Sequence, residues 1–280
     1  MESDHSSQTS TPSSRSNLVL IGIDGLNWGA ADDQTAPTLR ALAEQGAFAT
    51  MTMPVPTLSG PGWATLLTGA SPAQHGVVDN TFRGNNLALC PDLLSRAFHQ
   101  DPTTITFAGA SWPPLVDPNG VGPVIHHRAE QSSFGTHRVV SRDGEILGYQ
   151  RCDAEIATYA RAALRLPICP NVGFVHFCDA DETAHLHGST GPEYRASIAQ
   201  IDTYVADIVI GVQERVSQFK ERWLVAVTTD HGHRPEGGHG GGTPQEVASF
   251  VIIAGFGTDT PAMPPVLEPT ALMPFLLAAR

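Results

Sequence analysis

Residues 17–25 (NLVLIGIDG) form a short, continuous apolar run that stops at a carboxylate, Asp24. A run of this kind is typical of a strand buried on both faces of a sheet. Two later runs have the same form and are followed by acids: 172–178 (VGFVHFC) by Asp179 and Asp181, and 223–229 (WLVAVTT) by Asp230. One aspartate after a strand is often only a turn residue. Three such strand ends favour a shared site, because ligands of open α/β sheets bind beyond the carboxyl ends of the strands.

Helical patterns alternate with these strands. We expect helices over 36–46, 59–69, 153–164, 192–215 and 269–279, and further strands over 103–108 and 249–254. This alternation predicts an α/β fold, a three-layer α/β/α sandwich with a mostly parallel central sheet. Between residues 121 and 150 we expect irregular loops and a hairpin at Arg142-Asp-Gly, which is a turn signal.

The size and composition fit one large globular domain. The chain has 280 residues, 41% of them hydrophobic, and we assign 17–280 to a single domain. Residues 1–16 are rich in Ser and Thr, lack the apolar centre of a secretory signal, and are expected to be a disordered tail. No apolar run approaches the roughly 20 residues of a membrane helix. We therefore expect a cytoplasmic protein.

The charge balance excludes some partners. There are 16 Lys and Arg against 28 Asp and Glu, which gives a net charge of −12, and the only lysine is Lys220. So acidic a chain is a poor electrostatic partner for nucleic-acid polymers or anionic membranes, and we expect neither. A reaction that depends on a lysine side chain could use only Lys220. The unusual feature is the count of twelve histidines.

Several of these histidines lie close in sequence to the strand-end acids. Asp181 and His185 are four residues apart and would face the same side of a helical turn. Asp230 and His231 are adjacent at a strand end, and His239 lies in the glycine-rich loop 237–242. Together with Asp24 they make three carboxylates and three imidazoles, which suit Zn²⁺, or Mn²⁺ or Fe. Six ligands are too many for one tetrahedral ion and fit two divalent ions about 4 Å apart.

Three other histidines are less clear. His187 and His233 each lie two residues beyond a proposed ligand. They either face the substrate or support a ligand, or they are solvated loop histidines. His176 lies inside an apolar run and is expected to be a buried histidine of the core.

Ser59 is the candidate nucleophile. It opens a predicted helix, where unpaired N–H groups and partial positive charge favour anions. A serine hydroxyl beside a metal ion can attack phosphorus, and the N–H of Gly60 could hold a phosphoryl oxygen. The alternative is an ordinary helix N-cap, and Thr57 is the competing hydroxyl. Trp63 could stack on a base or an aryl group, or belong to the core.

The ordered motifs resemble the alkaline phosphatase superfamily, and within it the nucleotide pyrophosphatase/phosphodiesterase family. A strand ending in Asp-Gly is followed by 56–61 (PTLSGP), by 71–77 (SPAQHGV), and then by Asp-x-x-x-His, Asp-His-Gly and a His in a glycine loop. The similarity runs from about residue 17 to residue 255. It implies that Asp181, His185 and His239 hold one zinc ion. Asp24, Asp230, His231 and the nucleophile Ser59 would hold the other.

Two departures from the family pattern concern the substrate. Family members usually carry an Asn shortly after the nucleophile that contacts the phosphoryl oxygen, and Gly62 stands at that place here. The region inserted to shape the substrate pocket must be compact, at about 80–150. Asn80 at its start joins Gly60, Trp63 and His187 as a substrate-binding candidate.

The resemblance implies a two-metal phosphoesterase with a phosphoseryl intermediate on Ser59. The expected substrate is a small phosphodiester or a nucleotide pyrophosphate, because no arginine lies beside Ser59 to neutralise a doubly charged monoester. A phosphomonoesterase or phosphonate hydrolase on the same two-metal site is the alternative. A catalytically dead binding protein held together by metal is the alternative outside enzymes. The oligomeric state is left open.

Overall fold

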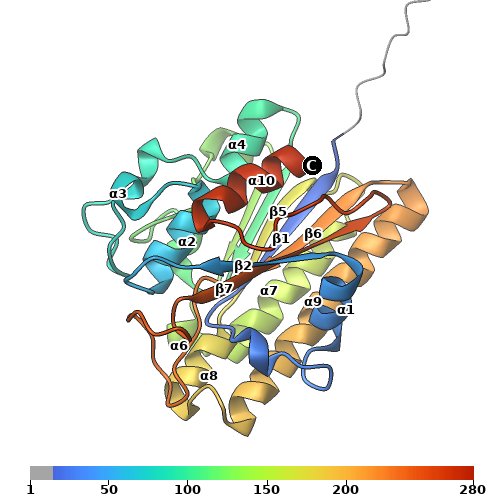
Figure 1. Ribbon diagram of the computed structural model, residues 1–280. Coiled ribbons are helices and arrows are strands. Elements are labelled where there is room, and N and C mark those ends of the chain that lie inside the picture. The colour runs from blue at the N-terminus through green and yellow to red at the C-terminus, as the bar shows by residue number, and fades with distance from the viewer. Residues whose placement is uncertain (1–14) are drawn as a thin grey trace, which may run out of the picture.

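Figure 1 shows the computed structural model of the protein, which describes residues 15–280. Seven strands form one sheet in the order β2-β7-β6-β1-β5-β3-β4. They are β1 Asn17–Ile23, β2 Ala47–Thr52, β3 Thr106–Ala110, β4 His137–Ser141, β5 Val172–Phe177, β6 Trp223–Thr228 and β7 Ala248–Phe256. Within this sheet only β7 runs against its neighbours, pairing antiparallel with both β2 and β6. The expected mostly parallel sheet is therefore confirmed.

Helices cover both faces of the sheet. They are α1 Pro37–Gln45, α2 Ser59–Thr68, α3 Pro72–His75, α4 Leu93–Gln100, α5 Ala129–Ser133, α6 Gly144–Leu147, α7 Tyr149–Leu164, α8 Asp179–His187, α9 Pro192–Phe219 and α10 Leu272–Ala279, with short 3₁₀ turns η1 Trp28–Ala30, η2 Leu87–Leu89, η3 Pro113–Leu115 and η4 Pro269–Ala271. In Figure 1, α2, α4 and α10 lie on one side of the sheet, and α1, α7 and α9 on the other.

Strand β1 shows how two cores arise from one apolar run. Leu18 and Leu20 belong to the core under α2, α4 and α10. Val19 and Ile21 belong to the core under α1, α7 and α9. Successive side chains of a strand point to opposite faces, so an all-apolar strand needs a cover on each side. The three-layer sandwich is confirmed.

The segment 80–150 differs most from expectation. The hairpin at Arg142-Asp-Gly is wrong, because β4 ends at Ser141 and runs parallel to β3. Asp143 instead caps α6 by accepting a hydrogen bond from the N–H of Ile146. The segment also supplies β3, β4 and α4, so it is largely part of the main fold rather than an insertion.

The N-terminal prediction is mostly outside the described residues. Of the tail expected over 1–16, only Arg15 and Ser16 are described, and Ser16 is buried. Within residues 15–280, no helix is both long enough and apolar enough to cross a bilayer.

Asp153 joins α7 to the start of α8. Its buried carboxylate accepts hydrogen bonds from the N–H of Cys178 at 3.1 Å and of Asp179 at 2.9 Å. Burial raises its pKa to about 7 despite these bonds. The contact fixes the beginning of α8, which carries Asp181 and His185.

Replacing Asp153 by alanine is expected to destabilise the protein by about 2 kcal/mol, because one buried and one partly buried N–H group lose their acceptor. Thermal unfolding should shift down by roughly 4–8 °C. Asp153→Asn keeps a carbonyl acceptor and serves as the matched control with a smaller shift. Equal unfolding temperatures for the two variants would contradict this role.

Candidate metal centre and active site

Three strand ends meet at one edge of the sheet, as the acids in the sequence predict. β1 lies between β6 and β5 in parallel register. Asp24 follows β1, Asp230 follows β6, and Asp181 lies in the first turn of α8 after β5. All three carboxylates are buried. Their convergence therefore follows from the order of three neighbouring parallel strands.

The first group of ligand atoms surrounds Asp181. It consists of Asp181, His185, His233 and His239, whose atoms all lie within 4.8 Å of one another. Asp181 Oδ2 is 3.5 Å from His185 Nε2, and Asp181 Oδ1 is 3.5 Å from His239 Nε2. The helical spacing of four residues brings Asp181 and His185 together on α8.

A second group consists of Asp24, Asp181 and His231, so Asp181 belongs to both. His231 Nε2 lies 3.4 Å from Asp24 Oδ1 and 3.3 Å from Asp230 Oδ2. The structure thus brings together all six ligands predicted from the sequence, and adds His233.

The backbone fixes the orientation of two of these imidazoles. His239 Nδ1 lies 2.6 Å from the carbonyl of Thr57, and His231 Nδ1 lies 3.2 Å from the carbonyl of Gly232. A carbonyl oxygen only accepts, so Nδ1 carries the hydrogen in both rings. The lone pair on Nε2 then faces the carboxylates, as in metal-binding histidines.

Burial and the repulsion between neighbouring carboxylates shift the pKa values of the three aspartates. Burial, followed by the charge of Asp24, raises the pKa of Asp181 to about 7 and that of Asp230 well above its usual value. Burial would also raise the pKa of Asp24, but hydrogen bonds from His176 and Trp63 and the nearby His231 lower it overall.

Divalent cations fit this donor set. Burial lowers the pKa of His231, so the ring is neutral and its lone pair is available. Asp230 Oδ2 is buried without a hydrogen-bond partner among the described residues. Buried carboxylates that face neutral imidazoles lack a positive charge, which divalent ions would supply.

Ser59 lies beside the second group. Its Oγ is 3.4 Å from Asp24 Oδ1 and 3.4 Å from His231 Nε2. The alternative, an ordinary N-cap, is wrong: Leu58 is the N-cap of α2, and Ser59 is the first helical residue. Its hydroxyl therefore faces the ligands instead of the helix backbone.

The competing hydroxyl, that of Thr57, is hydrogen-bonded to the glycine loop. Its Oγ1 donates to the carbonyl of Gly241 at 2.8 Å and accepts from the N–H of Gly240 at 3.0 Å. These bonds hold the glycine loop, and the carbonyl of Thr57 holds His239. The hydroxyl of Thr57 is therefore committed to the glycine loop, whereas that of Ser59 faces the predicted metal ligands.

The structure supports some of the predicted substrate-binding residues better than others. The N–H of Gly60 is not free for a phosphoryl oxygen, because it donates to Asn80 Oδ1 at 2.8 Å. Asn80 is thereby held beside Ser59, although it follows Ser59 by 21 residues in the sequence. The side chain of Asn80 therefore lies against Gly60, whereas Gly62 faces Asp230: a Cβ at Gly62 would lie 3.0 Å from the Cβ of Asp230.

Trp63 and His187 are not where a substrate would contact them. Trp63 is fully buried under the ligands, and its Nε1 donates to Asp24 Oδ2 at 2.8 Å. His187 is exposed at the end of α8, about 200° around the helix from His185. Stacking of Trp63 on a base is therefore wrong, and His187 is turned away from its predicted role.

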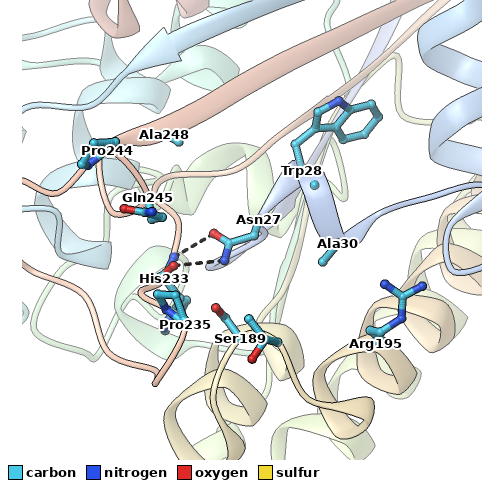
Figure 2. A pocket seen from close by; sticks show the side chains of 12 residues that line it. Asn27, Trp28, Ala30, Ser189, Arg195, His233, Pro235, Pro244, Gln245 and Ala248 are labelled. Atoms are coloured by element: carbon cyan, nitrogen blue, oxygen red, sulfur yellow. Dashed lines mark hydrogen bonds between the residues drawn. The ribbon is translucent and has the colours of Figure 1, made fainter.

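His233, left undecided between site and solvent, is the histidine that reaches the cluster. Its Nε2 lies 2.7 Å from Asp181 Oδ1. The side chain of Asn27 bonds both the N–H and the carbonyl of His233, and a cavity of about 590 Å³ lies beside this pair (Figure 2). Asn27, in the segment after β1, thus fixes the position of His233, in the segment after β6.

Comparisons with known proteins agree with this architecture. GPI ethanolamine phosphate transferase 1 of Mus musculus is 24% identical over 275 residues, which is 90% of this chain and 28% of that protein. Ectonucleotide pyrophosphatase/phosphodiesterase family member 7 of Homo sapiens is 24% identical over 233 residues, 78% of this chain and 48% of that protein. The chain therefore spans less than half the length of either relative.

A solved structure shares the fold over nearly its full length. Phosphonoacetate hydrolase from Sinorhizobium meliloti 1021, in complex with phosphonoacetate, superposes with a TM-score of 0.65 at 13% identity. The match covers 95% of this chain and 96% of that one. The sequence profile of the type I phosphodiesterase/nucleotide pyrophosphatase family matches residues 18–241. Because this match covers most of the chain, the protein belongs to the type I phosphodiesterase/nucleotide pyrophosphatase family.

Proposed function

We propose that this protein is a metal-dependent phosphoesterase that hydrolyses a phosphodiester or nucleotide pyrophosphate bond through a phosphoseryl intermediate on Ser59. The observation that supports this most is the position of Ser59 Oγ, 3.4 Å from both Asp24 Oδ1 and His231 Nε2. A hydroxyl at a helix start, beside buried metal-ligand atoms, is suited to attack phosphorus.

In this proposal Asp181, His185 and His239 hold one divalent ion, and Asp24, Asp230, His231 and Ser59 hold the second. Carboxylates mixed with imidazoles suit Zn²⁺ best, and also Mn²⁺ or Fe. When bound, such ions supply positive charge that eases loss of the hydroxyl proton and neutralises phosphoryl oxygens.

The residues of the chain would bind the phosphoryl group and form one covalent bond. Ser59 Oγ bonds to phosphorus as the bond to the leaving oxygen breaks, and water later displaces Oγ, with inversion at each step. Asn80 Oδ1 is occupied by the N–H of Gly60. This leaves the side-chain NH₂ of Asn80 to donate to a phosphoryl oxygen.

The absence of a nearby cationic side chain favours a singly charged diester. In residues 15–280, the hydrogen bonds and ion pairs of Ser59, Asp24 and Asp230 involve neither arginine nor lysine. A terminal monoester oxygen would bring a second negative charge close to three carboxylates.

Bis-p-nitrophenyl phosphate should therefore be a better substrate than p-nitrophenyl phosphate. We expect kcat/KM to favour the diester by about tenfold or more, which is about 1.4 kcal/mol in transition-state free energy. Phosphonoacetate, included in the same panel, tests the phosphonate alternative. Faster turnover of the monoester or of phosphonoacetate would contradict the proposed substrate class.

Transfer to an alcohol is a second candidate, because one relative is named a phosphate transferase. The same phosphoseryl intermediate would serve both reactions, and only the acceptor would differ. Hydrolysis of the diester in the presence of glycerol separates the two. Free phosphate ester as the main product supports hydrolysis, and a glycerol adduct as the main product supports transfer.

A further inference from the structure

The two carboxylate oxygens of Asp24 have different surroundings. Oδ2 accepts hydrogen bonds from Trp63 Nε1 at 2.8 Å and from His176 Nε2 at 3.1 Å. Oδ1 faces Ser59 Oγ and His231 Nε2, each at 3.4 Å. Asp24, Trp63 and His176 are all fully buried. One oxygen is therefore committed to N–H donors, and the other faces the reacting group.

Helix α2 contacts both oxygens. Ser59 and Trp63 are four residues apart, so they lie on the same face of the helix, one turn from each other. Ser59 reaches Oδ1 and Trp63 reaches Oδ2. The hydroxyl and the indole are thus placed by one rigid element, with the carboxylate of Asp24 between them.

The residues packed around Trp63 hold its indole ring in one orientation. Gly22 on β1 lies against the ring, and a Cβ at that position would come within 2.4 Å of the ring carbon Cη2. The ring of His176 stands edge-on to the indole, with centroids 5.0 Å apart, and the ring of Phe174 lies 6.0 Å away. The direction of the indole N–H is therefore fixed by the core.

The chemistry of the donors suits a supporting role. An indole N–H can only donate a hydrogen bond, so the nitrogen of Trp63 cannot be a metal ligand. Asp24 Oδ2 accepts, so His176 Nε2 carries the hydrogen, and His176 Nδ1 is buried without a hydrogen-bond partner among the described residues. Groups that hold a ligating carboxylate in this way tune its orientation and its affinity for metal.

We propose that Trp63 and His176 are positioning residues that hold Asp24 Oδ2, so that Oδ1 is the atom of Asp24 that binds metal beside Ser59. The inference rests on the proposed two-metal site. It gives Trp63 a role in place of the substrate stacking that the sequence suggested, and it explains a buried imidazole near the end of an apolar strand.

The test is the zinc affinity of the loaded protein, measured by competition with a chromophoric chelator. Trp63→Phe keeps the aromatic packing and loses the N–H, and His176→Leu loses the second donor. Each is expected to weaken binding of one of two zinc ions by about 10–100-fold. His176→Gln keeps an N–H donor and should stay within about threefold of wild type.

Phe174→Leu is the matched control, because Phe174 is equally buried against Trp63 and His176 but donates no hydrogen bond. It should lower the unfolding temperature and leave zinc affinity unchanged. Unchanged affinity in both Trp63→Phe and His176→Leu, or equal losses in Phe174→Leu, would overturn the inference while leaving the proposed function intact. Wild-type protein that binds neither zinc nor any other divalent metal ion would overturn both.

Discussion

Replacing Ser59 by alanine is expected to abolish turnover, with kcat falling by at least about 10⁴-fold. The loss follows from removal of the only protein atom proposed to bond to phosphorus. Metal content should stay close to wild type, because Ser59 is only one of the four side chains proposed to hold the second ion, and the carboxylates and imidazoles of the site are untouched. The measurement is steady-state hydrolysis of bis-p-nitrophenyl phosphate together with metal analysis of the same sample.

Thr57→Ala is the control for this result. Thr57 Oγ1 holds the glycine loop of His239 through Gly240 and Gly241. Its loss should weaken metal binding and lower the rate only in part, and added zinc should restore much of the rate. An active Ser59→Ala protein beside an inactive Thr57→Ala protein would move the nucleophile to Thr57.

Loss of the second metal should be nearly as damaging as loss of Ser59. Asp230→Asn removes the charge of a carboxylate whose Oδ2 has no hydrogen-bond partner among the described residues. We expect kcat to fall by more than the roughly 100-fold that loss of a group supporting a ligand costs. Chelation of wild-type protein should give the same loss, and it should be reversed by added zinc.

The stability of the metal-free protein separates this role from a structural one. Burial and the charges of Asp24 and Asp181 raise the pKa of Asp230. Without metal, the neutral amide of Asp230→Asn should therefore leave the protein at least as stable as wild type. With saturating zinc the order should reverse, because binding to the folded state adds about 2.7 kcal/mol at 100 times Kd. A less stable metal-free variant would contradict a metal-binding role for Asp230.

The convergence of the site was predictable because it depends on strand order and helical spacing alone. Apolar runs that stop at Asp24 and Asp230 place both acids at one edge once the strands are parallel neighbours. The spacing of Asp181 and His185 needs only a helix, and α8 provides it. The acids at the strand ends and the helical spacing are local features that the sequence contains directly, whereas the position of β1 between β5 and β6 is tertiary.

The choice between His187 and His233 could not be made from spacing. Each lies two residues beyond a ligand. On α8 a step of two residues turns the side chain about 200° around the helix axis, whereas in extended backbone the same step returns it to the same side. The segment at 231–234 is non-helical and is held by Asn27. Because Asn27 lies 206 residues before His233 in the sequence, spacing alone does not predict this contact.

The roles expected for Trp63 and for the N–H of Gly60 are wrong for a similar reason. The burial of Trp63 depends on the absence of a side chain at Gly22, which faces it across the core. The position of Asn80 depends on its bond to the N–H of Gly60. Neither contact has a periodic signal in the sequence. The parallel strand β4 was missed because its flanking Asp143-Gly pair starts a helix instead of a hairpin.

Metal content and diester hydrolysis, measured on one purified sample of wild type and one of Ser59→Ala, test the proposed mechanism most directly. We predict two divalent ions per chain in both proteins, and hydrolysis of bis-p-nitrophenyl phosphate in wild type alone. Tightly bound metal without hydrolysis of any phosphoester in wild type, or undiminished hydrolysis in Ser59→Ala, would contradict it.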